Sequence, residues 1–100
     1  MNPLLNLLGL ARKAGRLALG ATAVERRLKG NVISLLLVAS DASDNTVRRA
    51  RRWAEEIPSE LFVIPHDKAT FGRAVGRREC ALAALTDEGF AKALVAIKQE

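Results

Sequence analysis

The sequence contains few of the residues from which proteins build covalent cross-links and reactive centres. Its 100 residues include one cysteine, one histidine, four aromatic residues and no tyrosine. A single cysteine cannot form an internal disulfide framework, which fits a protein of a reducing compartment. The longest apolar runs are far shorter than the ~20 residues that span a bilayer, and residues 1–6 lack the basic start of a signal peptide. We therefore expect a cytoplasmic protein without a membrane segment.

The few reactive side chains do not form a recognisable catalytic or metal-binding set. Catalysis needs a nucleophile, a base and an orienting group at one place. We expect His66 to be an exposed loop residue and Cys80 to be an inert residue at the edge of a strand. Asp41 and Asp44 are close enough in sequence to be a carboxylate pair, but their position at a helix start favours a capping role. The sequence predicts no catalytic residue, no metal site and no cofactor.

The charge is distributed unevenly along the chain. The net charge is +5, from 16 Lys and Arg against 11 Asp and Glu. Up to Ala54 there are ten basic and three acidic residues, a net of +7, whereas the remainder has six basic and eight acidic residues, a net of −2. Such an excess attracts polyanions where it reaches the surface. Charge alone leaves two possibilities open, a nucleic-acid binder and a solvated basic protein without a particular partner.

Helical and strand patterns alternate at short spacing, with no repeat, linker or low-complexity segment. The unbroken apolar run 33–39 is typical of a strand covered on both faces. The boundary residues expected are Asn2 as an N-cap, Gly30-Asn31 as a left-handed stop and Pro58 as a helix terminator. One α/β domain over 1–100, a three-layer α-β-α sandwich, is the predicted fold. The expected helices are 4–14, 20–29, 44–57, 68–75 and 87–98, and the expected extended segments are 17–19, 33–39, 61–64 and 80–85.

The second predicted helix combines several features of an anion-binding site. Gly20 begins it, and a glycine lets a ligand approach the free N–H groups of the first turn. Thr22, Arg26 and Lys29 lie on the helix face opposite the apolar residues. A helix N-terminus with nearby cations is suited to phosphate groups and base edges. The alternative is an ordinary amphipathic surface helix.

The third predicted helix has a cluster of four arginines, Arg48, Arg49, Arg51 and Arg52. All four fall opposite the apolar stripe of that helix. Arg51 and Arg52 can each pair with the glutamate four residues later, which would weaken their field. The cluster is therefore either a solvated helix face or an auxiliary patch that contacts a phosphate backbone.

The aromatic residues indicate the kind of RNA that such a protein would bind. All four, Trp53, Phe62, Phe71 and Phe90, occupy apolar positions where we expect burial. Proteins that recognise single-stranded RNA usually display exposed aromatics on which bases stack. Since no aromatic residue is left for that role, an RNA partner should be recognised by the shape of a folded or double-stranded element.

Several segments together resemble a known family: residues 8–15, Gly20 at the helix start, and residues 36–43, 71–76 and 87–92. In the order and spacing of these segments, over essentially its whole length, the chain is similar to the small bacterial YlxQ-like proteins. They are members of the kink-turn RNA-binding ribosomal-protein superfamily, the L-seven-Ae type. The resemblance implies an α-β-α sandwich around a four-stranded mixed sheet. It also implies binding to RNA kink-turns, in which sheared G·A pairs follow a short bulge.

The resemblance also implies where the RNA would be bound. By position, the family's glycine at the helix start is Gly20, its usual Asn is Thr22, its Glu is Ala23 and its Lys is Arg26. A second contact is implied for the loop 77–79, which is charged here where family members usually carry apolar residues. Ala23 cannot accept a hydrogen bond and Thr22 is shorter than Asn, so direct recognition of guanine edges is weakened. The predicted RNA-binding residues are Gly20, Ala21, Thr22, Ala23, Arg26, Lys29, Arg77 and Arg78.

The leading hypothesis is a monomeric, non-catalytic protein that binds structured RNA, either ribosomal RNA or a kink-turn. One alternative is a protein-interaction module associated with the ribosome or the translation machinery, because a fold alone does not specify its partner. Another is an accessory domain of an RNA-modifying enzyme, which would require a separate catalytic subunit.

Overall fold

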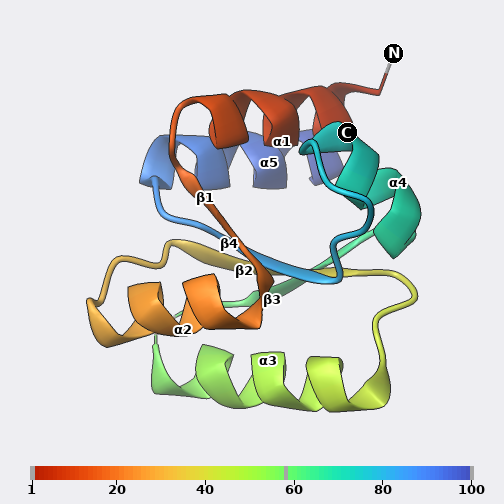
Figure 1. Cartoon of the computed structure of the whole chain (residues 1–100). Coiled ribbons are helices and arrows are strands. Elements are labelled where there is room, and N and C mark those ends of the chain that lie inside the picture. Colours follow the sequence, from red (N-terminus) through yellow and green to blue (C-terminus); the bar gives the residue numbers. More distant parts are fainter. Residues whose placement is uncertain (1, 58, 100) are drawn as a thin grey trace.

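A four-stranded mixed sheet forms the centre of the protein in the computed structural model, which describes residues 2–57 and 59–99 (Figure 1). The order of strands across the sheet is β1-β4-β2-β3. β1 (Leu17–Leu19) and β2 (Leu35–Ala39) both lie antiparallel to β4 (Leu82–Leu85), whereas β3 (Leu61–Ile64) lies parallel to β2. The mixed sheet that the family resemblance implies is therefore confirmed.

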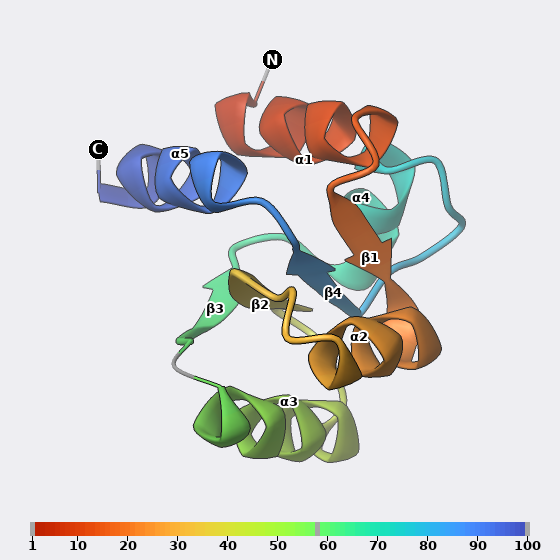
Figure 2. The same cartoon turned by 90° about the vertical axis from the view of Figure 1, so that its left-hand side faces the viewer.

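Within the described residues, five helices cover the two faces of this sheet (Figure 1, Figure 2). On one face lie α1 (Pro3–Lys13), α4 (Lys68–Ala74) and α5 (Glu88–Gln99). On the other face lie α2 (Gly20–Lys29) and α3 (Asp44–Glu56). The three-layer α-β-α sandwich predicted from the sequence is confirmed. None of the helices described is long and apolar enough to cross a membrane.

The side chains of the central strands point alternately toward the two helical layers. On β2, Leu37 belongs to the core cluster beneath α1, α4 and α5, and its neighbour Leu36 belongs to the cluster beneath α2 and α3. Both leucines are fully buried. Burial on both faces is the reason why this strand is a continuous apolar run instead of an alternating one. Of the aromatic residues, Trp53, Phe62 and Phe71 are buried as predicted, whereas Phe90 is only partly buried.

Several predicted boundaries are confirmed, and others are wrong in detail. Asn2 caps α1, since its Oδ1 accepts hydrogen bonds from the backbone N–H groups of the helix's second and third residues at 2.9 and 3.2 Å. β2 begins at Leu35 and β4 begins at Leu82, both later than expected, and the pairing of these two strands starts with Leu35 opposite Leu85. Cys80 therefore lies before β4 and not at its edge. After α2, Asn31 takes the left-handed conformation with φ 56°, and Gly30 does not. The predicted role of Pro58 lies outside the described residues.

The two aspartates near the start of α3 both lie at helix N-termini, but neither is the N-cap of α3. Asp41 Oδ1 accepts the N–H of Lys68, the first residue of α4, at 2.8 Å. It therefore ties the loop after β2 to the start of a helix far along the chain. The N-cap of α3 is Ser43, and Asp44 occupies the first turn, where a negative charge favours the helix dipole.

Candidate nucleic-acid interface

The candidate interface begins where β1 runs directly into α2. Gly20, the first residue of α2, has a φ of 85°, in the left-handed region that glycine adopts without strain. The N-cap is Leu19, which makes no side-chain capping hydrogen bond. A Cβ placed on Gly20 would meet no atom within 4 Å. The first turn of α2 is therefore an open corner at which a ligand can reach the backbone N–H groups.

A second element of the interface is the loop between α4 and β4. The N–H of Arg77 donates to the carbonyl oxygen of Gly72 at 2.8 Å, which holds the loop against α4. Gly72 is buried, and a Cβ there would lie 2.5 Å from the Cα of Glu79. Glycine is required at this position because the loop backbone passes directly over the helix. The loop consequently presents the exposed side chains of Arg77 and Arg78 from a fixed place.

These two elements meet at a pocket of about 200 Å³. Three of the residues predicted from the sequence, Gly20, Ala21 and Arg77, are brought together in its lining. Two residues from α3 that the sequence did not assign to the site, Thr46 and Arg49, also line it. The arginine cluster was the only signal for Arg49, and helix periodicity cannot tell which of four outward arginines faces another element. Of the four arginines in that cluster, Arg49 is the one that lines the pocket.

The other predicted site residues do not line the pocket. Thr22, Arg26 and Lys29 are exposed on the outer side of α2, as the helical periodicity predicts. Ala23 is partly buried and packs against the core cluster beneath α2 and α3, so it offers a methyl group to the protein interior. Arg78 is exposed on the loop. Around the pocket, these residues would provide a wider surface for a ligand larger than the pocket itself.

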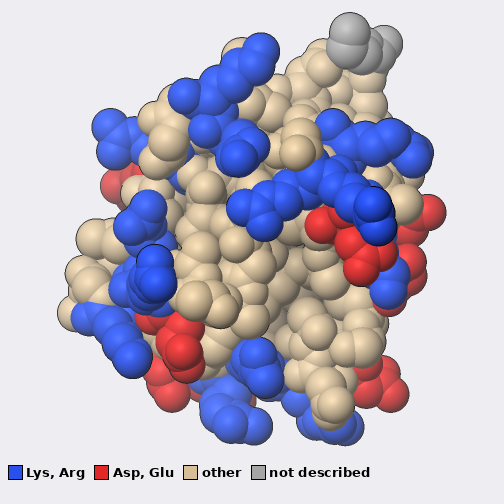
Figure 3. Space-filling view, in the orientation of Figure 1, with Lys and Arg blue, Asp and Glu red and all other residues tan. Residues whose placement is uncertain are grey.

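Basic side chains spread over the face on which this corner lies. In Figure 3, Lys and Arg occur over α1 at the top, across the upper right over the region of α4, over α2 at the left and over α3 at the bottom, and a smaller patch of Asp and Glu lies at the right. All four arginines of α3 are exposed. Among the side chains that the structure describes, the one salt bridge joins Lys92 and Glu88 of α5 at 3.7 Å. Within this described part of the chain, Arg51 and Arg52 form no such ion pair with the glutamates four residues later.

Cys80 contributes to the wall of the pocket but is not a reactive group. Burial raises the pKa of the Cys80 thiol to about 11, and the thiol donates to the carbonyl oxygen of Leu82 at 3.5 Å. A thiol with such a pKa is protonated at neutral pH and is a poor nucleophile. His66 is half-buried in the loop before α4, where its Nε2 lies 3.1 Å from Nδ2 of Asn2. The described residues include no group of three or more His, Cys, Asp or Glu that could hold a metal ion.

Comparisons with known proteins identify relatives over nearly the whole chain. The model of the ribosomal protein L7Ae/L30e/S12e/Gadd45 family matches residues 3–95. "RNA-binding protein YlxQ" from Bacillus subtilis (strain 168) is 30% identical over 95 residues, which are 91% of this chain and 90% of the relative. "RNA-binding protein YlxQ" from Enterococcus faecium is 31% identical over 91 residues, 88% of this chain and 84% of the relative.

Two solved structures have the same architecture. A protein with unknown function from Bacillus halodurans C superposes with a TM-score of 0.91 at 27% identity, over 100% of both chains. The Giardia lamblia 15.5kD RNA binding protein superposes with a TM-score of 0.74 at 19% identity, over 94% of this chain and 80% of the other. At that lower identity, the likeness shows a shared fold only.

Proposed function

Because the chain belongs to the ribosomal protein L7Ae/L30e/S12e/Gadd45 family, we propose that it is a non-catalytic protein that binds structured RNA. Its similarity to two proteins named RNA-binding protein YlxQ supports this proposal. The RNA would be ribosomal RNA or a kink-turn-like element, bound in the cytoplasm by a monomer without a cofactor. The binding surface would comprise the start of α2, the loop after α4 and the facing side of α3.

One observation carries the proposal: an uncapped helix start and two arginines from distant segments converge on one pocket. The start of α2 has no side-chain cap, and Arg77 and Arg49 approach the same pocket from the loop and from α3. Backbone N–H groups at a helix N-terminus bind anions, because the helix dipole adds to their hydrogen bonds. Arginine provides several donors in a planar fork that suits phosphate oxygens. The pocket is lined by these two arginines against one carboxylate, that of Glu79, and this combination fits a phosphodiester group better than a neutral ligand.

The surface around the pocket would follow a bent phosphate chain. Arg26 and Lys29 are exposed along α2, and Arg78 is exposed on the loop. Such cations position RNA through its backbone and carry little sequence information. Direct recognition of guanine edges in a kink-turn would fall to Thr22, which is exposed, since Ala23 has no polar side chain and is partly buried. We therefore expect recognition of RNA shape with weak base selectivity.

A gel-shift series tests the proposal directly. A kink-turn RNA, a plain duplex of equal length and a single strand are each titrated at two salt concentrations. The expected result is tightest binding to the kink-turn, weaker binding to the duplex and weakest binding to the single strand, which has no aromatic platform to stack on. Equal affinity for all three RNAs would contradict shape recognition and leave only general electrostatic attraction.

Charge-reversing variants locate the surface. Arg26→Glu and Arg77→Glu should each weaken kink-turn binding about tenfold and lower the salt slope by about one unit, because each removes a phosphate contact. Lys92→Glu on α5 is the matched control, since it makes the same change of charge on a helix that does not line the pocket. If the control weakens binding as much as Arg77→Glu does, the proposed location is wrong.

A further inference from the structure

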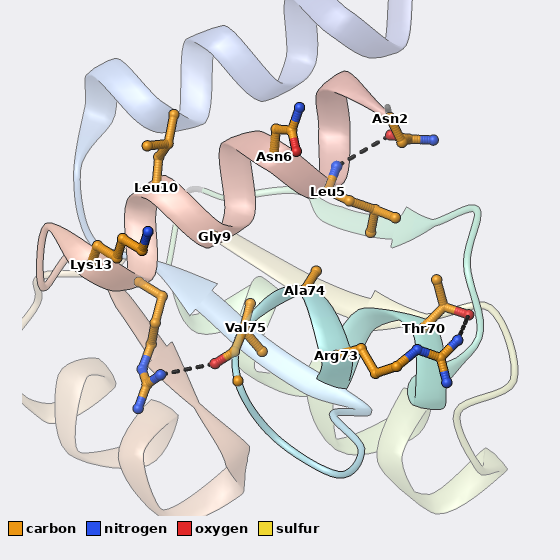
Figure 4. Close-up of a pocket in the computed structure, with 12 residues that line it drawn as sticks. Asn2, Leu5, Asn6, Gly9, Leu10, Lys13, Thr70, Arg73, Ala74 and Val75 are labelled. Carbon is orange, nitrogen blue, oxygen red and sulfur yellow. Dashed lines mark hydrogen bonds between the residues drawn. The ribbon is translucent and has the colours of Figure 1, made fainter.

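A large hollow lies between α1 and α4. It has a volume of about 740 Å³ and is formed by one side of α1 with its N-cap Asn2, and by α4 from Thr70 onward with the two residues that follow it, Val75 and Gly76. Figure 4 shows the two helices bordering it, with Leu5 and Ala74 facing the space between them. The pocket at the start of α2 has none of these lining residues. This groove is therefore a separate surface from the proposed RNA-binding surface.

The floor of the groove is aliphatic, and the two helices approach each other closely across it. Gly9 lies at the crossing, where a Cβ would sit 3.0 Å from the carbonyl oxygen of Ala74. Leu5 and Ala74 are partly buried beside it, and Val75 is buried. Leu10, on α1, is 58% exposed and also lines the groove. A large apolar side chain that is mostly in water next to an apolar groove favours an interaction with another apolar surface.

The rim of the groove is basic. Among its lining residues are Arg12, Lys13 and Arg73, and there is no Asp or Glu. Nη1 of Arg12 donates to the carbonyl oxygen of Val75 at 2.8 Å, which fixes the guanidinium at the rim and leaves its other N–H groups for a ligand. Lys13 and Arg73 are exposed, on different helices. The groove therefore complements a ligand that is apolar on one side and carries carboxylates at its edges.

We propose that the α1–α4 groove binds an acidic amphipathic segment of a partner protein. Apolar side chains of the segment lie on the floor formed by Leu5, Gly9 and Ala74 and cover Leu10. Its Asp or Glu side chains pair with Arg12, Lys13 and Arg73. RNA fits this groove less well, because a phosphodiester backbone has no apolar side to bury and the lining has no aromatic residue on which a base could stack.

The proposal is tested with a synthetic peptide of about 15 residues, a length at which an isolated helix becomes marginally stable. Leucine recurs every three or four positions, and the other positions are Glu, Asp and Ala. The peptide is titrated into the ¹⁵N-labelled full chain. The expected result is a dissociation constant on the order of 10 µM, as for small transient interfaces, with shifted amide signals at Gly9, Leu10, Arg73 and Ala74. No shift at these residues, or equal shifts with a peptide carrying Lys in place of Glu and Asp, overturns the proposal.

Two variants and two matched controls complete the test. Leu10→Asp and Arg73→Glu should each weaken peptide binding at least fivefold, and both sites are exposed, so the fold is retained. Val32→Asp changes another exposed hydrophobic residue, and Lys92→Glu reverses a charge outside the groove, so neither should alter peptide affinity. Equal loss of affinity in the controls overturns the proposal.

An RNA titration separates this surface from the proposed RNA-binding surface. Leu10→Asp should change kink-turn affinity by no more than about twofold, through long-range charge alone, because Leu10 does not line the pocket at the start of α2. If RNA duplex shifts the amides of the α1–α4 groove and the acidic peptide does not, the groove belongs to RNA and the peptide proposal fails.

Discussion

The pocket at the start of α2 and the α1–α4 groove are both bordered by basic side chains, yet they differ in what lies beneath the charges. In the pocket, the open backbone of Gly20 at the uncapped start of α2 lines the same space as Arg49, Arg77 and Glu79. In the groove, methyl and methylene groups lie beneath the cations, and the start of α1 is capped by Asn2. Positive charge attracts any polyanion, whereas N–H groups or apolar surface decide which kind of anionic ligand remains bound.

The two hollows are lined by neighbouring parts of one chain segment, since residues 73–76 line the groove and Arg77 and Glu79 line the pocket. Its first part lines the groove from α4, and its last part lines the pocket from the loop. The two surfaces therefore share a support, and variants along this stretch show whether they function separately.

Gly72→Ala should disrupt the pocket most strongly. Its Cβ would lie 2.5 Å from the Cα of Glu79, so the loop after α4 must move away from the helix. Overpacking of this kind at a buried site should cost about 3 kcal/mol of unfolding free energy, measured by urea denaturation. RNA affinity should fall as well, because Arg77 loses its fixed place. A Gly72→Ala protein with normal stability and normal RNA affinity would show that the loop position does not matter.

The buried thiol in the wall of the pocket should make stability fall at high pH. Burial raises the pKa of Cys80 from 9.0 to about 11, so the folded protein holds the thiol proton more tightly than the unfolded chain does. The stabilisation is complete below pH 9.0 and is lost as the pH rises to about 11, by at most about 3 kcal/mol in all. Urea denaturation across this range measures the loss. Cys80→Ala should lack this component, and an identical pH profile in that variant would contradict the assignment.

Arg49→Glu and Arg51→Glu provide a matched pair on a single helix. Both residues are exposed on α3, but only Arg49 lines the pocket. Arg49→Glu should weaken RNA binding about tenfold, equivalent to 1.4 kcal/mol, while Arg51→Glu should weaken it about two- to threefold through long-range charge alone. Gel-shift titration measures both. Equal effects would mean that the whole arginine cluster acts as a diffuse patch and that the pocket has no special role.

Gly9→Ala should have the smallest effect and should be confined to the groove. Alanine is preferred over glycine within a helix by about 1 kcal/mol, and this gain opposes the cost of a Cβ placed 3.0 Å from the Ala74 carbonyl oxygen. The free energy of unfolding, measured by thermal denaturation, should therefore change by less than about 1 kcal/mol. RNA affinity should remain at the level of the unaltered chain. A loss of RNA affinity would show that the spacing of α1 and α4 is transmitted to the pocket.

Much of the architecture is predictable from local patterns. The helices were predicted to within a few residues, and Asn2 caps α1 as its position before Pro3 indicates. β2 is recognisable because burial on both faces demands a continuous apolar run. In contrast, the position of β1 at the sheet edge beside β4 depends on pairing between segments far apart in the sequence. A three-residue strand has too little pattern of its own to indicate its partner.

The candidate sites were less predictable than the fold. Gly20 and the outward face of α2 follow from residue type and helical spacing, and the exposure of Thr22, Arg26 and Lys29 agrees with that spacing. The participation of Arg49 in the pocket, and the capping of α4 by Asp41, were not predicted. Both depend on where separate elements meet. The groove between α1 and α4 was not predicted either, because each helix alone shows only an ordinary amphipathic pattern.

The helices and the buried central strand follow from local residue patterns, and the sign of the net charge follows from composition alone. The tertiary structure decided which helix start remains open, which arginine faces it and where apolar surface is left uncovered. Those outcomes depend on how the sheet brings distant segments together. A pocket is defined by the distances between its walls, and local periodicity does not contain those distances.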